Sequence, residues 1–298
     1  MQKKSIGSGP FLVLAGALCF STSGLSQAIA PEGASPFTVT ALRLFGGGCA
    51  LLLWCIWRRL LPRRGNWPFK YMLPAVLGLI GCTLFFFIGT ARAGVVVGTV
   101  VTIGSIPIMS ALLGMLFLGE RPARAWYPAT GVAILGLTLL QRGGVGAIDP
   151  LALLPSLTAA FSYAVFMVSG KTLTRTHPPE TVQMVLSLLA GACLLPACFI
   201  FPMEWVLTLK GTMVALNLAV ITSAMAFSLV LAGLRTTPTA TASTLGLAEP
   251  LCASLMGIFY LGEPVTPSIL TGLLCIFAAM IILIAFPQRN LQPSPPAA

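Results

Sequence analysis

The chain has 298 residues, of which 57% are hydrophobic and only 8% are charged, and its formal net charge is +10. A soluble domain carries roughly 25% charged residues, and one core of this size could not bury so much apolar surface. The composition therefore excludes a soluble globular protein. The basic residues lie in short segments between apolar runs, which favours a role in membrane orientation over nucleic-acid binding.

Ten apolar runs follow one another along the chain, each near the length that a transmembrane helix needs. They are 10–30, 36–57, 71–91, 95–118, 125–141, 150–170, 181–201, 211–234, 239–261 and 266–286. The first run is long enough to span and resembles the sixth, so we expect no cleaved signal peptide. The short connections leave no room for a soluble domain, and the Pro-rich tail 287–298 is expected to be disordered.

The Lys and Arg residues predict how the chain is oriented. If the N-terminus is cytoplasmic, thirteen of these cations lie in inner segments and three, Arg92, Arg142 and Lys210, lie in outer ones. Arg43 is left inside the second run. We therefore expect a multi-pass protein of the plasma membrane, a bacterial inner membrane, with both termini in the cytoplasm.

Two stretches of the chain, 107–120 and 250–263, repeat one another without a gap at an offset of 143 residues. The identities are Pro107/Pro250, Leu112/Leu255, Gly114/Gly257, Leu118/Leu261, Gly119/Gly262 and Glu120/Glu263. The same offset matches Thr38/Thr181, Val39/Val182, Gly48/Gly191 and Arg92/Arg235. Residues 1–145 and 146–286 are thus expected to be two copies of one all-α unit. Because each copy holds five runs, the second must enter the membrane inverted, an architecture that transporters use.

Ten spans, a duplication and the P-x4-L-x-G-x3-L-G-E ending of spans four and nine resemble the EamA family of the drug/metabolite transporter superfamily. The A-L-R-L-F run around Arg43 and the A-E-P step at 248–250 are similar to that family too. The resemblance implies a two-lobed helical bundle, with a central cavity lined by spans one, three, four, six, eight and nine. Spans five and ten would lie at the periphery. It further implies export of amino acids or related metabolites.

Two matched pairs of residues suggest how the repeats work. Pro107 and Pro250 lie near the middle of spans four and nine, where proline removes a backbone donor; each is either a hinge or a static kink. Glu120 and Glu263 end the L-G-E motifs, and each precedes a proline that suits the start of the next helix. We expect these carboxylates to cap helices, with a gating role as the alternative.

Glu249 is the only acid well inside a predicted span, and Arg43 is the only cation deep in one. An ionisable residue in the membrane is a functional hypothesis by default, because an unpaired charge there is costly. The repeat position of Glu249 is Ile106, which continues a stripe through Thr99 and Thr102. On such a face Glu249 could bind an amine or couple transport to protons. We favour a buried ion pair with Arg43, or a gate, over these two roles.

Polar and aromatic side chains on the matching spans one and six, with Thr99, Thr102 and Glu249, are the predicted substrate contacts. They are Phe20, Ser23 and Gln27 on span one, and Ser162, Tyr163 and Phe166 on span six. Each hydroxyl could instead bond to its own backbone or a neighbour. The mixture of rings and hydroxyls suits a small amphipathic solute such as a neutral amino acid.

These features favour a secondary transporter of small metabolites over an intramembrane enzyme or a channel-like protein. The sequence has no G-x-S-x-G or H-E-x-x-H motif, no Walker A motif and no filter sequence or charged ring. No cofactor or metal is expected, because the eight cysteines lie in apolar runs without metal-ligand spacing. Substrate, coupling ion, flux direction and the choice between monomer and homodimer stay open.

Overall fold

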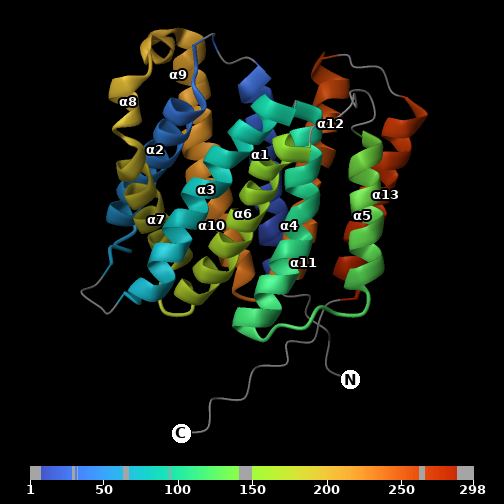
Figure 1. The fold of residues 1–298 in the computed structure, drawn as a ribbon. Coiled ribbons are helices and arrows are strands. Elements are labelled where there is room, and N and C mark those ends of the chain that lie inside the picture. Colours follow the sequence, from blue (N-terminus) through green and yellow to red (C-terminus); the bar gives the residue numbers. More distant parts are fainter. Residues whose placement is uncertain are drawn as a thin grey trace, which may run out of the picture.

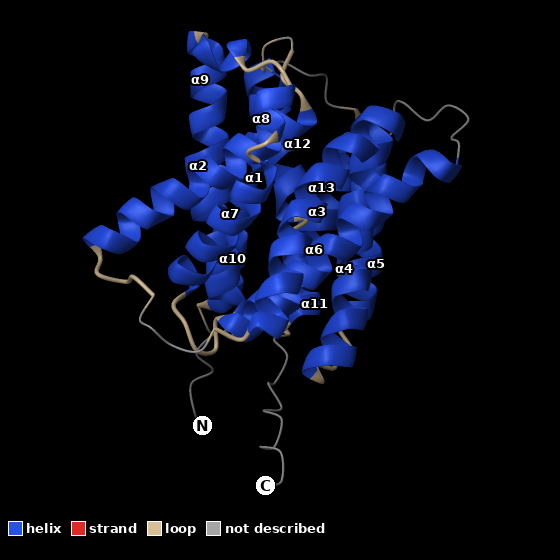
Figure 2. Cartoon of the chain, turned by 60° about the vertical axis from the view of Figure 1, so that its left-hand side comes forward, coloured by secondary structure: helices blue, strands red, loops and turns tan. Residues whose placement is uncertain are grey.

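The computed structural model describes residues 8–28, 31, 33–62, 67–93, 95–140, 150–261 and 266–286. This part of the chain consists of helices and loops, without a strand (Figures 1 and 2). Seven of its helical stretches are long and apolar enough to cross a membrane, and two shorter apolar helices accompany them. The predicted all-helical fold is therefore confirmed, with several helices long and apolar enough to span a membrane, and the ten spans in two inverted repeats stay a prediction.

The first half of the chain forms long helices. They are α1 (Gly9–Ala28), α2 (Pro36–Trp57), α3 (Phe69–Ala93), α4 (Val95–Leu118) and α5 (Trp126–Leu140). Ser35 caps α2, since its side-chain oxygen accepts from the backbone N–H of Thr38, and Pro36 suits the first helical turn. Gly119 ends α4 with φ = 66°, and the N–H of Glu120 then donates to the carbonyl of Gly114. A left-handed glycine of this kind is a common helix stop.

The second half is more divided. It comprises η1 (Pro150–Leu153), α6 (Leu154–Leu173), α7 (Pro179–Leu194), α8 (Ala197–Ile200), η2 (Glu204–Leu207), α9 (Leu209–Leu216), η3 (Asn217–Met225), α10 (Ala226–Leu234), α11 (Thr239–Leu245), α12 (Ala248–Leu261) and α13 (Pro267–Ala285). The predicted run 211–234 contains the π-helical segment η3, and the run 239–261 breaks at Gly246 and Leu247. Neither is a single regular helix.

Pro107 and Pro250 lie in different surroundings. Pro107 lies inside α4, which continues past it. Pro250 lies in the first turn of α12, where a residue without an N–H loses no intrahelical hydrogen bond. The chain therefore accommodates Pro250 by starting a new helix just before it.

The helix ends gather in two groups. At one end, Trp67 before α3 stacks on His177 before α7, with ring centroids 4.1 Å apart, and Thr181 donates to the carbonyl of Leu60. We call this the Glu120 end, and it is the lower end in Figure 1. At the opposite end, α8 and α9 lie together (Figure 1), and the hydroxyl of Ser268 at the start of α13 donates to the carbonyl of Leu139 near the end of α5.

Close packing between helices depends on small residues. A Cβ at Gly78 of α3 would lie 2.7 Å from the carbonyl oxygen of Ser162 in α6, so the glycine permits the backbones to approach. α2 packs along α7 in the same bundle, and α1 packs along α10. α5 and α13 pair with each other at one edge (Figure 1), as the resemblance led us to expect.

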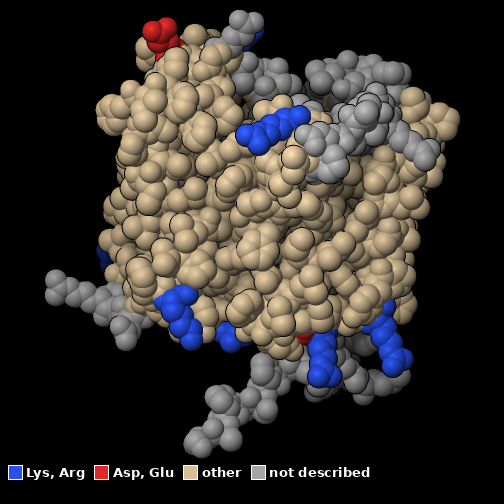
Figure 3. All heavy atoms as spheres, in the orientation of Figure 1, with Lys and Arg blue, Asp and Glu red and all other residues tan. Residues whose placement is uncertain are grey.

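The surface is arranged as a membrane protein requires. Large apolar side chains face outward, for example Leu116 at 76% exposure and Phe199 at 92%. Most of the Lys and Arg visible in Figure 3 lie along the lower edge, and the broad band above them is almost free of charge. Lipid can solvate such a band, whereas water could not do so without cost.

Candidate functional site: a central charged cavity

A cavity with an empty volume of about 900 Å³, its open part included, lies between helices from both halves of the chain. Residues of α1, α3, α4, α6, α10, α11 and α12 line it, together with one side chain of α2. Its wall is mostly apolar and aromatic, with few polar groups. Ligand cavities commonly have this character.

The break between α11 and α12 opens onto the cavity. Gly246, at the break, and Glu249, in the first turn of α12, both line it. Helices interrupted inside the membrane are tolerated where the irregular backbone faces a cavity, and transporters place substrate sites at such breaks.

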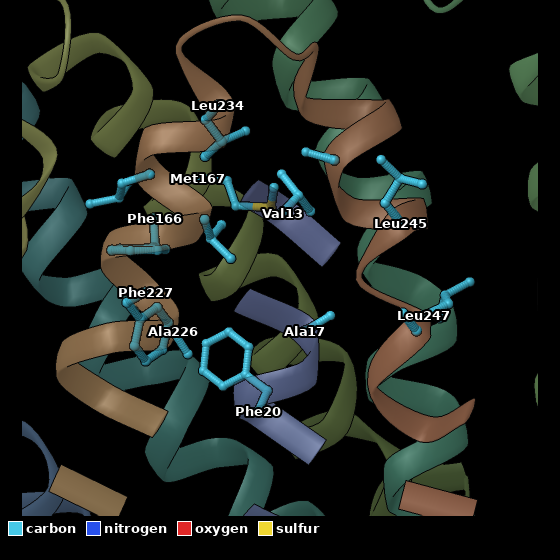
Figure 4. Packing of buried hydrophobic residues seen from close by; sticks show 14 of the residues in the cluster. Val13, Ala17, Phe20, Phe166, Met167, Ala226, Phe227, Leu234, Leu245 and Leu247 are labelled. Atoms are coloured by element: carbon cyan, nitrogen blue, oxygen red, sulfur yellow. The ribbon is translucent and has the colours of Figure 1, made fainter. Parts of the chain in front are cut away.

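Arg43 is the only α2 residue in the wall, and it is only 8% exposed. Its Cζ lies 5.9 Å from the ring centroid of Phe20 and 5.7 Å from that of Phe227. Those two rings meet edge to face at 4.8 Å, between α1 and α10 (Figure 4). The rings stabilise the guanidinium through their faces without using its N–H donors. The Nε of Arg43 is buried and has no hydrogen-bond partner.

Glu249 and Arg43 share the cavity but do not touch. Within the described ranges, the one pair of charged side chains within 4.0 Å is Glu120 with Lys171. No side-chain hydrogen bond to Glu249 is found there either, although its backbone N–H donates to Gly246. The expected ion pair of Arg43 and Glu249 is thus not a direct contact in this structure, although each contributes to the electrostatic environment of the other.

The hydroxyls of the wall are largely committed to the backbone. Thr83 donates to the carbonyl of Leu79, Thr102 to that of Ser156, and Ser243 to that of Ala240. Their hydrogens are therefore not available to a solute. The charged groups of the wall are the guanidinium of Arg43 and the carboxylate of Glu249, and neither makes an ion pair with another described residue.

The predicted substrate contacts fall into three groups. Those that line the cavity are Phe20, Ser23, Thr102, Tyr163 and Glu249. Those that lie away from its wall are Thr99, Ser162 and Phe166. Ser162 instead faces Gly81 of α3, and Phe166 is fully buried against Phe227. The side chain of Gln27 lies outside the described residues.

Several residues of the wall were not singled out from the sequence. They are chiefly Cys82, Thr83 and Phe86 of α3, Phe227 and Val230 of α10, Ser243 of α11, and Gly246 at the break that follows α11. Their spans were expected to line the cavity, but substrate contacts were sought mainly on spans one and six. The aromatic Phe227 and the mid-span Thr83 were the available signals.

Glu120 forms a second charged site, at the end named after it. Its Oε1 lies 2.7 Å from the Nζ of Lys171 in α6. Its Oε2 accepts from the backbone N–H and from the hydroxyl of Thr239, each at 2.7 Å. Glu120 therefore caps α11, in the other half of the chain, and not the helix that follows it in sequence.

The L-G-E motif explains this placement. Gly119 turns the chain back at the end of α4, and a Cβ at Gly114 would collide with the hydroxyl of Thr239. The two glycines thus bring Glu120 onto α11. Its repeat counterpart Glu263 lies outside the described residues.

Comparison with known proteins matches this architecture to one family. The model of the EamA-like transporter family matches residues 7–142 and again residues 150–285. An uncharacterized transporter, YwfM of Bacillus subtilis, is 34% identical over 281 residues, which cover 93% of this chain and 94% of that protein. The threonine/homoserine exporter RhtA of Escherichia coli K12 is 28% identical over 91% of this chain and 89% of its own length.

The fold is also similar to a solved crystal structure, with a TM-score of 0.81 at 20% identity. That similarity covers 92% of this chain and 96% of the other. The two matches of the family model, the relatives and the helical bundle agree. This chain belongs to the EamA-like transporter family.

Proposed function

We propose that this protein is a secondary transporter that carries small amphipathic solutes, amino acids or similar metabolites, out of the cytoplasm by alternating access of the central cavity. The cavity itself carries the proposal. Helices of both halves form its wall, and it holds two charged side chains, Arg43 and Glu249, in a chain that is otherwise poor in charge. Buried charges in a membrane protein are costly and are retained where they serve a solute pathway.

The proposal includes ten spans in two inverted repeats, residues 1–145 and 146–286. The separate matches of the family model to 7–142 and 150–285 support a duplication. Packing supports a two-fold relation: Gly48 packs on Leu188, Gly191 packs on Phe45, and the 143-residue offset converts one contact into the other. α3 packs along α6 in the same manner as η3 and α10 pack along α1.

We place the Glu120 end in the cytoplasm, with both termini there and the protein in a bacterial inner membrane. The cations near that end are Arg58, Arg59, Lys70, Arg121, Arg124, Lys171, Arg175 and Arg235. Arg92 and Lys210 belong to the opposite end. The excess of Lys and Arg supports this orientation. Pro107 and Pro250 would serve as hinges, and the α11–α12 break lies close to the second of them.

Export of an amino acid is supported by the relative named as a threonine/homoserine exporter, at low identity. The apolar and aromatic wall around two charges suits a small solute with both polar and apolar parts. A channel or an intramembrane enzyme would not need a cavity shared by two related halves.

The test is reconstitution in liposomes, followed by a counterflow screen over amino acids and related metabolites at two pH values. We expect saturable exchange of at least one neutral amino acid. A protein that keeps its size-exclusion profile yet exchanges no solute would contradict the transporter assignment. Ohmic current would favour a channel instead, and formation of a new product would favour an enzyme.

A further inference from the structure

We infer that Arg43 and Glu249 form a two-pole binding site that selects zwitterions. Arg43 binds the carboxylate of the solute, and Glu249 binds its ammonium group. This inference rests on the proposed function and deepens it, because it assigns the orientation of the solute and the two groups that a substrate must carry.

Neither charged group has an ion-pair partner among the described residues. The Nε of Arg43 is buried without a partner, and its side chain is more than nine-tenths buried in the cavity wall. Among the described residues, Glu249 has no ion pair and no side-chain hydrogen bond. Leaving two such groups unpaired at low dielectric costs stability, and a ligand that pairs with both removes that cost.

Two aromatic rings hold Arg43 in the cavity wall. Phe20 and Phe227 stabilise the cation through their ring faces at 5.9 and 5.7 Å. A guanidinium carries five N–H donors in a planar fork that fits a carboxylate with two parallel hydrogen bonds. The rings fix the position of the cation and leave this fork for a ligand.

Glu249 lies in the same cavity as Arg43 but beyond the distance of an ion pair. The two residues line the same cavity but stand on helices from different halves, α2 and α12. Because they are not in contact, a small solute can lie between them and bind both. The remaining wall, which includes Ile103, Phe86 and Val230, offers apolar surface to the solute's side chain.

Chemically blocked solutes test the inference in the unmodified protein. Radiolabelled L-threonine, L-leucine and L-phenylalanine are each offered in counterflow, with competition by the amino acid, its carboxamide and its N-acetyl derivative. We expect each blocked form to compete at least about tenfold more weakly than the free amino acid that is exchanged, since each lacks one charged contact.

Two matched variants assign the poles. In Arg43→Gln, affinity for the free amino acid should fall at least about tenfold, while that for the carboxamide should change less than about threefold. In Glu249→Gln, affinity for the free amino acid should likewise fall at least about tenfold, while affinity for the N-acetyl derivative should change less than about threefold. Arg124→Gln and Glu204→Gln make the same changes at exposed sites and should leave competition unaltered. If Arg43→Gln does not fold, Arg43→Lys keeps the charge and should keep the preference for the free carboxylate.

The possible failures are distinguishable. Equal competition by a blocked form and by the free amino acid would overturn the two-pole site while the transporter function stands. The two-pole site would also be overturned if the protein exchanged other solutes but none of the three amino acids. Exchange of no solute at all by the folded protein would reject the proposed function together with this inference.

Discussion

Within the part of the chain that the structure describes, two sets of opposite charges lie inside the helical bundle, and their surroundings differ. Glu120 and Lys171 meet at 2.7 Å, and the carboxylate also accepts two hydrogen bonds from Thr239. Lys171 donates in addition to the carbonyl of Thr237. Arg43 and Glu249 face one cavity without contact, and the Nε of Arg43 has no partner.

The difference separates a structural role from a binding role. The Glu120 site joins α4, α6 and α11, and so ties the two halves together at one end of the bundle. A satisfied pair of this kind has nothing left for a solute. The cavity pair keeps its hydrogen-bonding capacity, which is useful only if something else supplies the partners. Stability measurements on single variants test this distinction.

Lys171→Met has the largest expected effect on stability. It leaves the Glu120 carboxylate largely buried without its cation, which typically costs about 3 kcal/mol or more. The apparent melting temperature in detergent should fall by several degrees, and Lys70→Met, at an exposed cation, should leave it unchanged. The double variant Glu120→Gln/Lys171→Met should recover much of the loss. A single variant as stable as the parent would show that the pair does not hold the two halves together.

Thr239→Val has a smaller expected effect. It removes the hydroxyl that donates to Glu120 but keeps the backbone N–H that caps α11 through the same carboxylate. The loss should be about 1–2 kcal/mol, because the hydrogen bond is to a charged group that stays buried. Thr138→Val, at an exposed site on α5, is the control for the same comparison of melting temperatures. Equal losses in the two variants would mean that the Thr239 hydroxyl contributes nothing specific.

The long helices could be predicted from the sequence because their cause is local. Apolar runs of sufficient length identify α2 and α4 with the bounds that the structure gives. The breaks could not be located in this way. The π-helical segment η3 and the break at Gly246 depend on which backbone carbonyl accepts the hydrogen bond of each N–H, and hydropathy carries no information about that pairing. Pro250 predicted an irregular helix, but it did not indicate whether the helix would break before or after the proline.

The site was predictable in its charges but not in its geometry. Arg43 and Glu249 stood out because ionisable residues are rare inside apolar runs. Which neighbour faces the cavity depends on helix rotation, so Tyr163 lines it while the adjacent Ser162 packs on Gly81. The partner of Glu120 lies 119 residues away at Thr239, and only the folded arrangement of the two halves joins them.

Arg43→Met has the smallest expected effect on stability and is therefore the sharpest test of the comparison. Arg43 makes no ion pair among the described residues, its buried Nε has no hydrogen-bond partner, and the apolar Met side chain can still pack against Phe20 and Phe227, so the apparent melting temperature should stay the same or rise. Counterflow of the amino acid should nevertheless be lost, since the carboxylate of the solute loses its partner. A fall in melting temperature as large as that of Lys171→Met would show that Arg43 supports the fold, as Glu120 and Lys171 do. A residue that serves only to bind a solute should contribute little to stability when no ligand is present.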